Sequence, residues 1–267
     1  YRLAQSSHAE KFVLKGALMF VAWRAPATRP TMDIDLLGHT DNSVENLVSV
    51  FRDVCSHPVE DDGLVFHADG VEGKRIKEDA DYEGVRVTFQ GNLQNAVIHM
   101  QIDVGFGDVV VPSAVLTEYP VMLDFQPPKL YGYTRESAVA EKFEAMVKLG
   151  LLNSRMKDFY DLWLLSRQFD FDGPLLADAV TKTFERRGTE INVQPLALTK
   201  TFADDESKAA QWRAFIRKSR LQDAPKNLAQ VVEVLAPFLI PVATSISDRQ
   251  PFNCQWKSPG PWLAAET

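Results

Sequence analysis

The sequence predicts an α+β protein in which a mixed-sheet half is followed by a helical half. Before about residue 130, segments of alternating apolar and polar residues, typical of strands, are mixed with segments of helical spacing. From residue 135 onward nearly every segment has apolar residues at i, i+3 and i+4, as amphipathic helices do. The proline pair Pro127-Pro128 marks the change. We therefore expect an α/β domain over 1–130 and a helical domain over 131–267.

The first half begins with a strand, a helix and a second strand. Residues 11–24, KFVLKGALMFVAWR, predict a short strand that turns into a helix after Gly16. TMDIDLLG predicts a strand that ends at Gly38. Residues 41–55 predict an amphipathic helix with an Asp or Asn cap. Residues 56–80 are polar and rich in turn-forming residues, with one expected strand at GLVFHA.

Two longer strands and five helices are expected after this region. GVRVTFQG and NAVIHMQIDVGFGD predict two strands joined by a turn at 92–95. The expected helices are ESAVAEKFEAMVKLGLL, RMKDFYDLWLLSRQF, GPLLADAVTKTFERR, ESKAAQWRAFIRKS and KNLAQVVEVLAPFL. From Ser247 the chain is rich in proline and polar residues, and we expect an irregular tail that packs through Trp256 and Trp262.

Composition excludes some classes of protein. The 267 residues carry a net charge of −7, which argues against sequence-independent coating of nucleic acid but not against a local basic groove. The two cysteines match no metal or disulfide spacing, as is typical of a reducing compartment. The apolar stretch VVEVLAPFLIPVA is short and contains Glu233 and two prolines, and no signal peptide is recognised. We therefore expect a cytoplasmic protein without a membrane span.

Asp33 and Asp35 are the first candidate functional residues. Side chains two residues apart in a strand share a face, so these carboxylates would repel each other. Asp103 lies in another apolar strand, where an unpaired carboxylate is unfavourable. If the strands are neighbours, the three acids form a site for a hard divalent cation, most commonly Mg²⁺. Such a site can activate a hydroxyl and neutralise a triphosphate. The alternative is that the acids cap loops or pair with arginines.

Several basic and small residues are candidates for binding phosphate. The Lys15-Gly16-Ala17 turn precedes a predicted helix and lies 17 residues before Asp33. A glycine there lets backbone N–H groups approach a phosphate, whereas Ala17 offers no hydroxyl. Arg29 and Arg86 are further candidates, with surface ion pairs as their alternative.

Lys142 lies near the apolar face of its predicted helix. Its ammonium group can snorkel to solvent or point into an acidic cleft, where it would bind β- and γ-phosphates. Asp158 and Asp161 follow on the next helix, and Asp161 can equally be a structural partner of Arg155 or Lys157.

The other polar motifs are less specific. The five histidines show no ligand spacing, although His99 shares a strand face with Asp103. No nucleophile elbow supports Ser/His/Asp catalysis. The basic segments FERRGTE and WRAFIRKSRL can form an RNA-facing groove with Trp212 available for stacking, or can simply be solvated helix faces.

Three stretches together resemble the AbiEii/AbiGii abortive-infection toxin family of nucleotidyltransferases. They are FVLKGALMFVAWRAPATRPTMDIDLLG, YTRESAVAEKFEAMVKLG and RMKDFYDLWLL, which occur in the family's order and cover roughly residues 1–170. The resemblance implies a polymerase-beta-like nucleotidyltransferase domain. It implies that Asp33 and Asp35 are metal ligands and Asp103 the third acid. It also implies that Lys142 contacts nucleotide phosphates and that Asp158 completes the site.

The resemblance also implies Mg²⁺ as cofactor, an NTP as substrate and a cognate antitoxin as partner. In relatives with a known acceptor, the nucleotide is transferred to the tRNA 3′ end. We therefore predict a nucleotidyltransferase toxin of a bacterial toxin–antitoxin or phage-defence system that modifies RNA. The first alternative is transfer to a small molecule or protein side chain. The second is a non-catalytic binding module whose acids hold a structural ion or pair with arginines.

Overall fold

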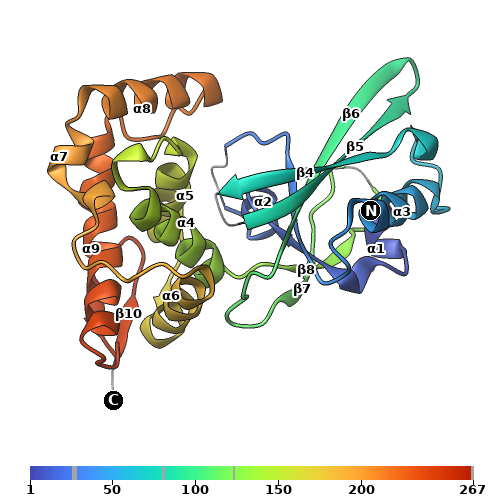
Figure 1. Ribbon diagram of the computed structural model, residues 1–267. Helices are drawn as coiled ribbons and strands as arrows, with labels where there is room; N and C mark the ends of the chain where they lie inside the picture. Colours follow the sequence, from blue (N-terminus) through green and yellow to red (C-terminus); the bar gives the residue numbers. More distant parts are fainter. Residues whose placement is uncertain (26–28, 80–81, 123, 266–267) are drawn as a thin grey trace. The chain divides into compact units, whose positions relative to one another are not determined.

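The computed structural model describes residues 1–25, 29–79, 82–122 and 124–265 (Figure 1). The chain forms two compact units, and each is described by itself. The first contains Tyr1–Asp108 and Ala114–Tyr133, and the second contains Val109–Ser113 and Thr134–Thr267. The first unit holds a mixed sheet and the second is mainly helical. The predicted α+β class is therefore confirmed.

Eight strands form the sheet of the first unit. They are β1 Phe12–Lys15, β2 Ile34–Gly38, β3 Leu64–Phe66, β4 Glu72–Asp79, β5 Tyr82–Leu93, β6 Ala96–Phe106, β7 Val115–Glu118 and β8 Lys129–Gly132. Their order is β3-β5-β6-β2-β1-β8-β7, and β4 also pairs with β5, on the edge that β3 shares and away from β6. Strand β2 is parallel to β6 and antiparallel to β1. The two acid-bearing strands predicted from the sequence are therefore neighbours.

Three strands of this sheet were not expected from the sequence: β4, β7 and β8. Strand β4 lies in the region that we expected to be rich in turns. Its polar composition gives no strand signal, although it pairs with β5 over nearly its whole length. By contrast, the predicted turn between the two long strands is confirmed. Leu93 pairs with Ala96, which leaves Gln94 and Asn95 as a two-residue loop.

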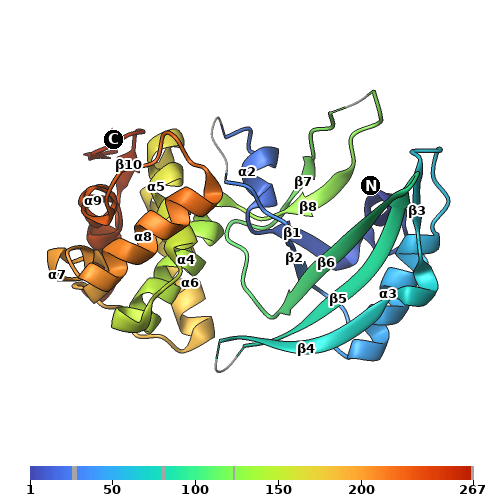
Figure 2. The ribbon, with the colours of Figure 1, turned by 90° about the horizontal axis from the view of Figure 1, so that it is seen from above.

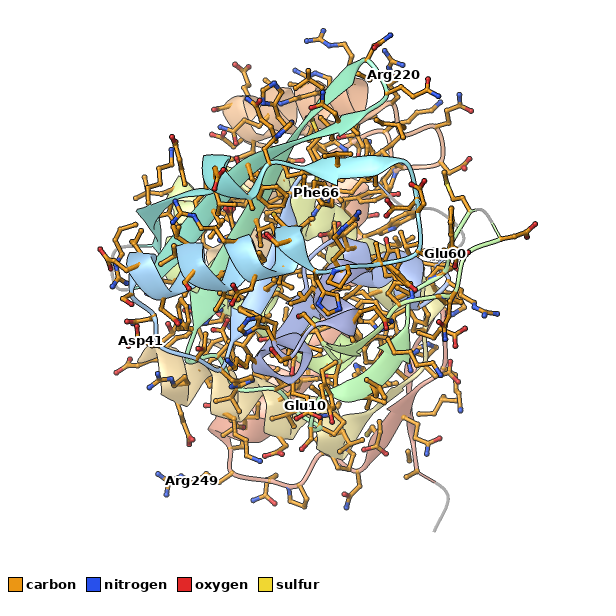
Figure 3. The ribbon with its side chains drawn as sticks, turned by 90° about the vertical axis from the view of Figure 1, so that its right-hand side faces the viewer. Glu10, Asp41, Glu60, Phe66, Arg220 and Arg249 are labelled. Carbon is orange, nitrogen blue, oxygen red and sulfur yellow. The ribbon has the colours of Figure 1, made fainter. Side chains whose placement is uncertain are left out.

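Helices of the first unit cover part of the sheet. They are α1 Arg2–Gln5, α2 Leu18–Ala22 and α3 Val44–Ser56, with 3-10 turns η1 Ala9–Lys11 and η2 Ala68–Gly70. Helix α3 lies along β4 and β5 (Figure 2). Its N-cap is Ser43, whose hydroxyl accepts the N–H of Asn46, rather than the expected Asp or Asn. Asp41 supports this end of α3 by accepting the N–H of Ser43 (Figure 3).

The second unit contains the five helices predicted from the sequence and one short addition. They are α4 Arg135–Leu149, α5 Met156–Gln168, α6 Gly173–Arg187, α7 Lys200–Ala203, α8 Glu206–Ser219 and α9 Leu228–Ser247, with 3-10 turns η3 Gly150–Leu152 and η4 Leu196–Leu198. Helix α5 packs against both α4 and α9. Side chains of Thr134, Asp172, Asp205 and Asn227 cap α4, α6, α8 and α9, which fixes where these helices begin.

Helix α9 corrects the expectation that its apolar stretch is short. It runs for 20 residues and continues through Pro237 and Pro241. Among the described helices, it is the one long and apolar enough to cross a membrane by length and composition. Its buried side chains belong to the core of the helical unit, where α9 packs on α5 and α6.

The C-terminal segment is ordered as strands and is not the irregular tail that we expected. Strands β9 Phe171–Asp172, β10 Cys254–Trp256 and β11 Trp262–Ala264 form a small antiparallel sheet. The indole N–H of Trp256 donates to the carbonyl of Ser166 at 2.6 Å, and that of Trp262 to the carbonyl of Phe238 at 2.9 Å. Because these rings surround Phe238, the hairpin closes the core at this end of α9.

Candidate active site

Four charged residues lie at one level across the sheet of the first unit. Asp35 on β2 is opposite Asp103 on β6, Lys15 on β1 is opposite Asp35, and Arg86 on β5 is opposite Asp103. Residues directly opposite in a sheet project from the same face. The row Arg86–Asp103–Asp35–Lys15 therefore places two neighbouring acids between two cations.

Asp103 is held by Arg86. The Arg86 Nε lies 2.7 Å from Oδ1 of Asp103, and a terminal guanidinium nitrogen lies 2.7 Å from Oδ2. The Asp103 side chain is only 10% exposed, and this bidentate ion pair compensates its burial. Asp103 and Arg86 therefore form an ion pair, which is the alternative role that the sequence analysis gives for each of them.

Asp35 lies against the turn between β1 and α2. A Cβ placed on Gly16 would be 1.9 Å from Oδ2 of Asp35, and Gly16 has φ +72°. Only glycine therefore accommodates both this backbone conformation and the closeness of the carboxylate. The phosphate-binding glycine predicted from the sequence thus has a packing role. Ala17 is buried at the N-cap of α2, a helix of only five residues.

Lys15 points into the first unit. Its Nζ lies 2.7 Å from the Asp108 carboxylate and 5.4 Å from the centre of the Tyr133 ring. Both charged side chains of this pair are largely buried. Lys15 is consequently part of a structural ion pair as well as of the charged row.

Asp33 is the most exposed of the three acids and lies immediately before β2. Its Oδ1 accepts a hydrogen bond from the side-chain amide of Gln101 at 3.0 Å. Gln101 is two residues before Asp103 on β6, so both project from the same face. Arg29 is partly exposed in the segment that leads into β2. The acids predicted to converge are thus brought to one face, at the N-terminal end of β2.

A divalent cation would find two carboxylates with access to solvent, those of Asp33 and Asp35. Both oxygens of Asp103 accept from Arg86, so direct ligation by Asp103 would require Arg86 to move away. Within the described residues no three His, Cys, Asp or Glu side chains converge as a metal site. The residues fit a cation held by Asp33 and Asp35, with Asp103 beside it.

Lys142 belongs to a buried charge cluster in the helical unit. Its Nζ lies 2.8 Å from Asp158 and 2.9 Å from Asp161, both on α5 and both about 1% exposed. Arg155 Nε lies 2.7 Å from the other oxygen of Asp158. Burial alone would raise the pKa of Asp158, but the charges of Lys142 and Arg155 outweigh it and lower the pKa to about 2. The four charges therefore sum to zero inside the unit.

This cluster bears on the alternatives considered for Lys142 and Asp161. The Lys142 ammonium does not snorkel to solvent, because its side chain is only 14% exposed and two carboxylates hold it. Asp161 has Lys142 as a partner, a pairing that was not predicted from the sequence.

Trp212 also differs from the sequence prediction. It is fully buried, and its indole N–H donates to the carbonyl of Pro225 at 2.9 Å. It is therefore a core residue and not a stacking platform. In the segment FERRGTE, Arg187 pairs with Glu141 and with the buried Glu144.

Sequence reasoning missed Asp108 and Gln101 as neighbours of the acids. Gln101 carried a usable signal, because its two-residue spacing from Asp103 predicts a shared face. Asp108 carried none, because its pairing with Lys15 depends on how β1 approaches the end of β6.

Comparison with known proteins gives one family match and two similar crystal structures. Residues 1–234 match the model of a family described as the nucleotidyl transferase AbiEii toxin of a type IV toxin–antitoxin system. No curated protein sequence matches the chain. Two crystal structures from Helicobacter pylori are similar in fold. One, described as a candidate nucleotidyltransferase, is 13% identical with a TM-score of 0.47 and covers 93% of this chain and 92% of that chain. The other, JHP933, is 13% identical with a TM-score of 0.46 and covers 93% and 88%.

Proposed function

The chain belongs to the family of AbiEii nucleotidyltransferase toxins, and we propose that it transfers a nucleoside monophosphate from an NTP to RNA, with the tRNA 3′ end as acceptor. The family implies an NTP substrate and a cognate antitoxin. We place the reaction in the cytoplasm. The observation that carries the proposal is the shared sheet face on which Asp33, Asp35 and Asp103 meet.

In the proposed reaction an acceptor hydroxyl oxygen attacks the α-phosphorus of the NTP. A new P–O bond forms, the bond to the bridging oxygen of the β-phosphate breaks, and pyrophosphate leaves. Asp103 accepts the hydroxyl proton, and Arg86 fixes the orientation of its carboxylate. Asp33 and Asp35 hold the divalent cation. When bound, Mg²⁺ supplies neutralisation of the phosphate charge.

The remaining roles are those that the sequence predicts. Lys15, Gly16, Ala17 and Arg29 would lie on the phosphate side of the acids, with Lys15 also paired to Asp108. The resemblance to the family also assigns Lys142 and Asp158 to the nucleotide site, and their side chains lie 2.8 Å apart in the helical unit. Arg29 would act as a guanidinium donor to phosphate oxygens.

Exposed cations on α8 support an RNA acceptor. Arg213, Arg217, Lys218 and Arg220 are exposed at the C-terminal half of this helix. Within the described part of the chain none of these four side chains makes an ion pair. Exposed cations that make no ion pair can form a local site for phosphates even in a chain of net charge −7.

The test combines purified protein, Mg²⁺, each labelled NTP and total tRNA. We expect the parent protein to label RNA and Asp33→Asn to reduce labelling by about two decades or more, because the lost charge weakens cation binding. Glu60→Gln, in the exposed loop after α3 (Figure 3), removes one charge elsewhere in the same unit and should keep full activity. No labelling by a folded parent protein with any NTP would refute the proposal, as would full activity of Asp33→Asn.

A further inference from the structure

A polar pocket adjoins the acids in the first unit. It has a volume of about 520 Å³ and is lined in part by Asp33 and Gln101, the two residues joined by a hydrogen bond. Its floor continues the sheet face of the acids. Gln101 is opposite Thr88, and His99 is opposite Gln90, so these side chains project from the face that also carries Asp103.

The lining chemistry selects against phosphate. None of the described residues that line the pocket is a lysine or arginine, whereas Asp33 and Glu72 are both acidic and exposed. The remaining polar groups are amides, imidazoles and a hydroxyl, which both donate and accept hydrogen bonds. Met32, 92% exposed, adds an adaptable apolar surface. An uncharged ligand with a flat ring and hydroxyl groups, such as a nucleoside, matches this set and this volume.

The position of the pocket distinguishes the two nucleosides of the proposed reaction. In the sheet order β5-β6-β2-β1, the acids on β6 and β2 separate the pocket over β5 and β6 from the turn after β1. The attacking oxygen and the leaving pyrophosphate must lie roughly in line on opposite sides of the α-phosphorus. With the phosphates on the β1 side, the attacking hydroxyl arrives from the β6 side.

We propose that this pocket binds the base and ribose of the acceptor's terminal nucleoside and thereby presents its hydroxyl to the acids. The inference rests on the proposed function, because that function supplies the direction of attack. It goes further in assigning His99, Gln90 and Glu72 to acceptor recognition. Glu72 and Asp33 make the pocket selective for a 3′ end that carries a hydroxyl instead of a phosphate.

The first experiment measures RNA binding without NTP or metal. The probe is a short fluorescein-labelled single-stranded RNA with a free 3′-hydroxyl, compared with the same RNA bearing a 3′-phosphate. The double variant Gln90→Ala/His99→Ala should raise the Kd of the 3′-hydroxyl probe about tenfold, through loss of two hydrogen-bonding side chains. The 3′-phosphate should weaken binding to the parent protein several-fold, and Glu72→Gln should reduce that penalty. His39→Ala removes an exposed histidine beyond the other end of β2 and should change nothing.

The second experiment separates the acceptor from the NTP. In the transfer assay the double variant should raise the KM for RNA and leave the KM for NTP unchanged. A rise in the KM for NTP instead, or a Kd for RNA within about twofold of the parent value, would overturn the proposal. Absence of a 3′-phosphate penalty would overturn it as well.

The two experiments also separate failure of the pocket from failure of the proposed function. If the parent protein binds RNA as expected but transfers no nucleotide, the pocket remains an RNA 3′-end site, and the proposed function fails together with the pocket's role in presenting an acceptor. If it transfers nucleotide but the double variant behaves as the parent, the function stands and the pocket proposal fails. Thermal melts of each variant check that these exposed substitutions leave the fold intact.

Discussion

Asp35 and Asp103 lie opposite each other on adjacent parallel strands, where two carboxylates alone would repel. The row explains how the fold tolerates them, since Arg86 holds one end and Lys15 occupies the other. Arg86 also makes Asp103 a weak candidate for direct metal ligation while the pair is intact. Asp103 is assigned the proton in the proposed reaction because of its place opposite Asp35, and not because the ion pair with Arg86 favours protonation.

Gly16 gives a prediction at the scale of one residue. Gly16→Ala places a methyl group against the Asp35 carboxylate and forces an L-residue to adopt φ +72°. We expect a loss of about 2–4 kcal/mol in the free energy of unfolding, measured by urea denaturation, together with loss of nucleotide transfer. The transfer loss follows because Asp35 must move.

Gly188→Ala is the matched control for this prediction. Gly188 also has positive φ, +61°, but a Cβ there meets nothing within 4 Å. The change should therefore cost only the backbone term, about 1–2 kcal/mol, and leave transfer intact. Equal losses of stability and activity in the two variants would contradict the assigned role of Gly16.

The spacing of residues along the chain decided which site residues could be predicted from the sequence. Asp33, Asp35 and Asp103 could be grouped because strands have a two-residue period and apolar strands tend to be central. Pairing with arginine was an alternative, but which cation lies beside which acid could not be identified, because Arg86 and Lys15 reach the acids through cross-strand register. Register is set by the assembled sheet and is not visible in either strand alone.

At the scale of elements, the charge cluster between α4 and α5 dominates the helical unit. Lys142→Met removes the one ammonium group that contacts both buried carboxylates, those of Asp158 and Asp161. We expect a cost of about 3–5 kcal/mol in the stability of this unit, measured by chemical denaturation. Lys182→Met removes an exposed i,i+4 partner of Asp178 on α6 and should cost under about 1 kcal/mol. Similar costs for both variants would show that the cluster is not a stabilising unit.

The same cluster sets a dependence on pH. The pKa of Asp158 is lowered from 3.8 to about 2, so its ionised form contributes stability above pH 3.8. That contribution is lost as the pH falls from 3.8 through about 2. Lys142→Met removes the main cause that lowers this pKa, so its acid unfolding should begin at higher pH than in the parent protein. Melting curves recorded across this range check the shift, and coincident acid transitions would contradict it.

The long helices were all predicted, whereas strands β4, β7 and β8 and the small C-terminal sheet were not, for a reason that particular elements illustrate. Helices α4 and α6 carry the apolar period and a capping residue within their own sequence. Strand β4 has little apolar alternation and exists because β5 offers it an edge to pair with. The hairpin β10–β11 likewise depends on β9 and on the ring of Phe238, which are distant in sequence. In both cases pairing with other strands, and not the intrinsic β-propensity of the segment, decides that a strand forms.

At the scale of the whole molecule, the distribution of charge matters more for the choice of acceptor than the net charge does. The net charge of −7 was compatible with an acceptor other than RNA. The exposed cations of α8 concentrate positive charge locally, because Arg213 and Arg217 are one helical turn apart and Arg220 is the C-cap of the same helix. A stripe of this kind engages successive phosphates without reading sequence.

The stripe gives the last prediction, which concerns the salt dependence of RNA binding. Arg213→Gln/Arg217→Gln/Arg220→Gln should lower RNA affinity and reduce the slope of log K against log[salt] by about 2, since each lost phosphate contact removes roughly 0.7–0.9. The control is Lys129→Gln/Lys182→Gln/Lys257→Gln. It also removes three positive charges, but from lysines already paired with Glu118, Asp178 and Asp170. Fluorescence anisotropy with tRNA at several salt concentrations measures both slopes. If the two triple variants lose the same slope, the effect is one of net charge and α8 is not the RNA-binding surface. If only the α8 variant loses slope, the phosphate contacts belong to this helix.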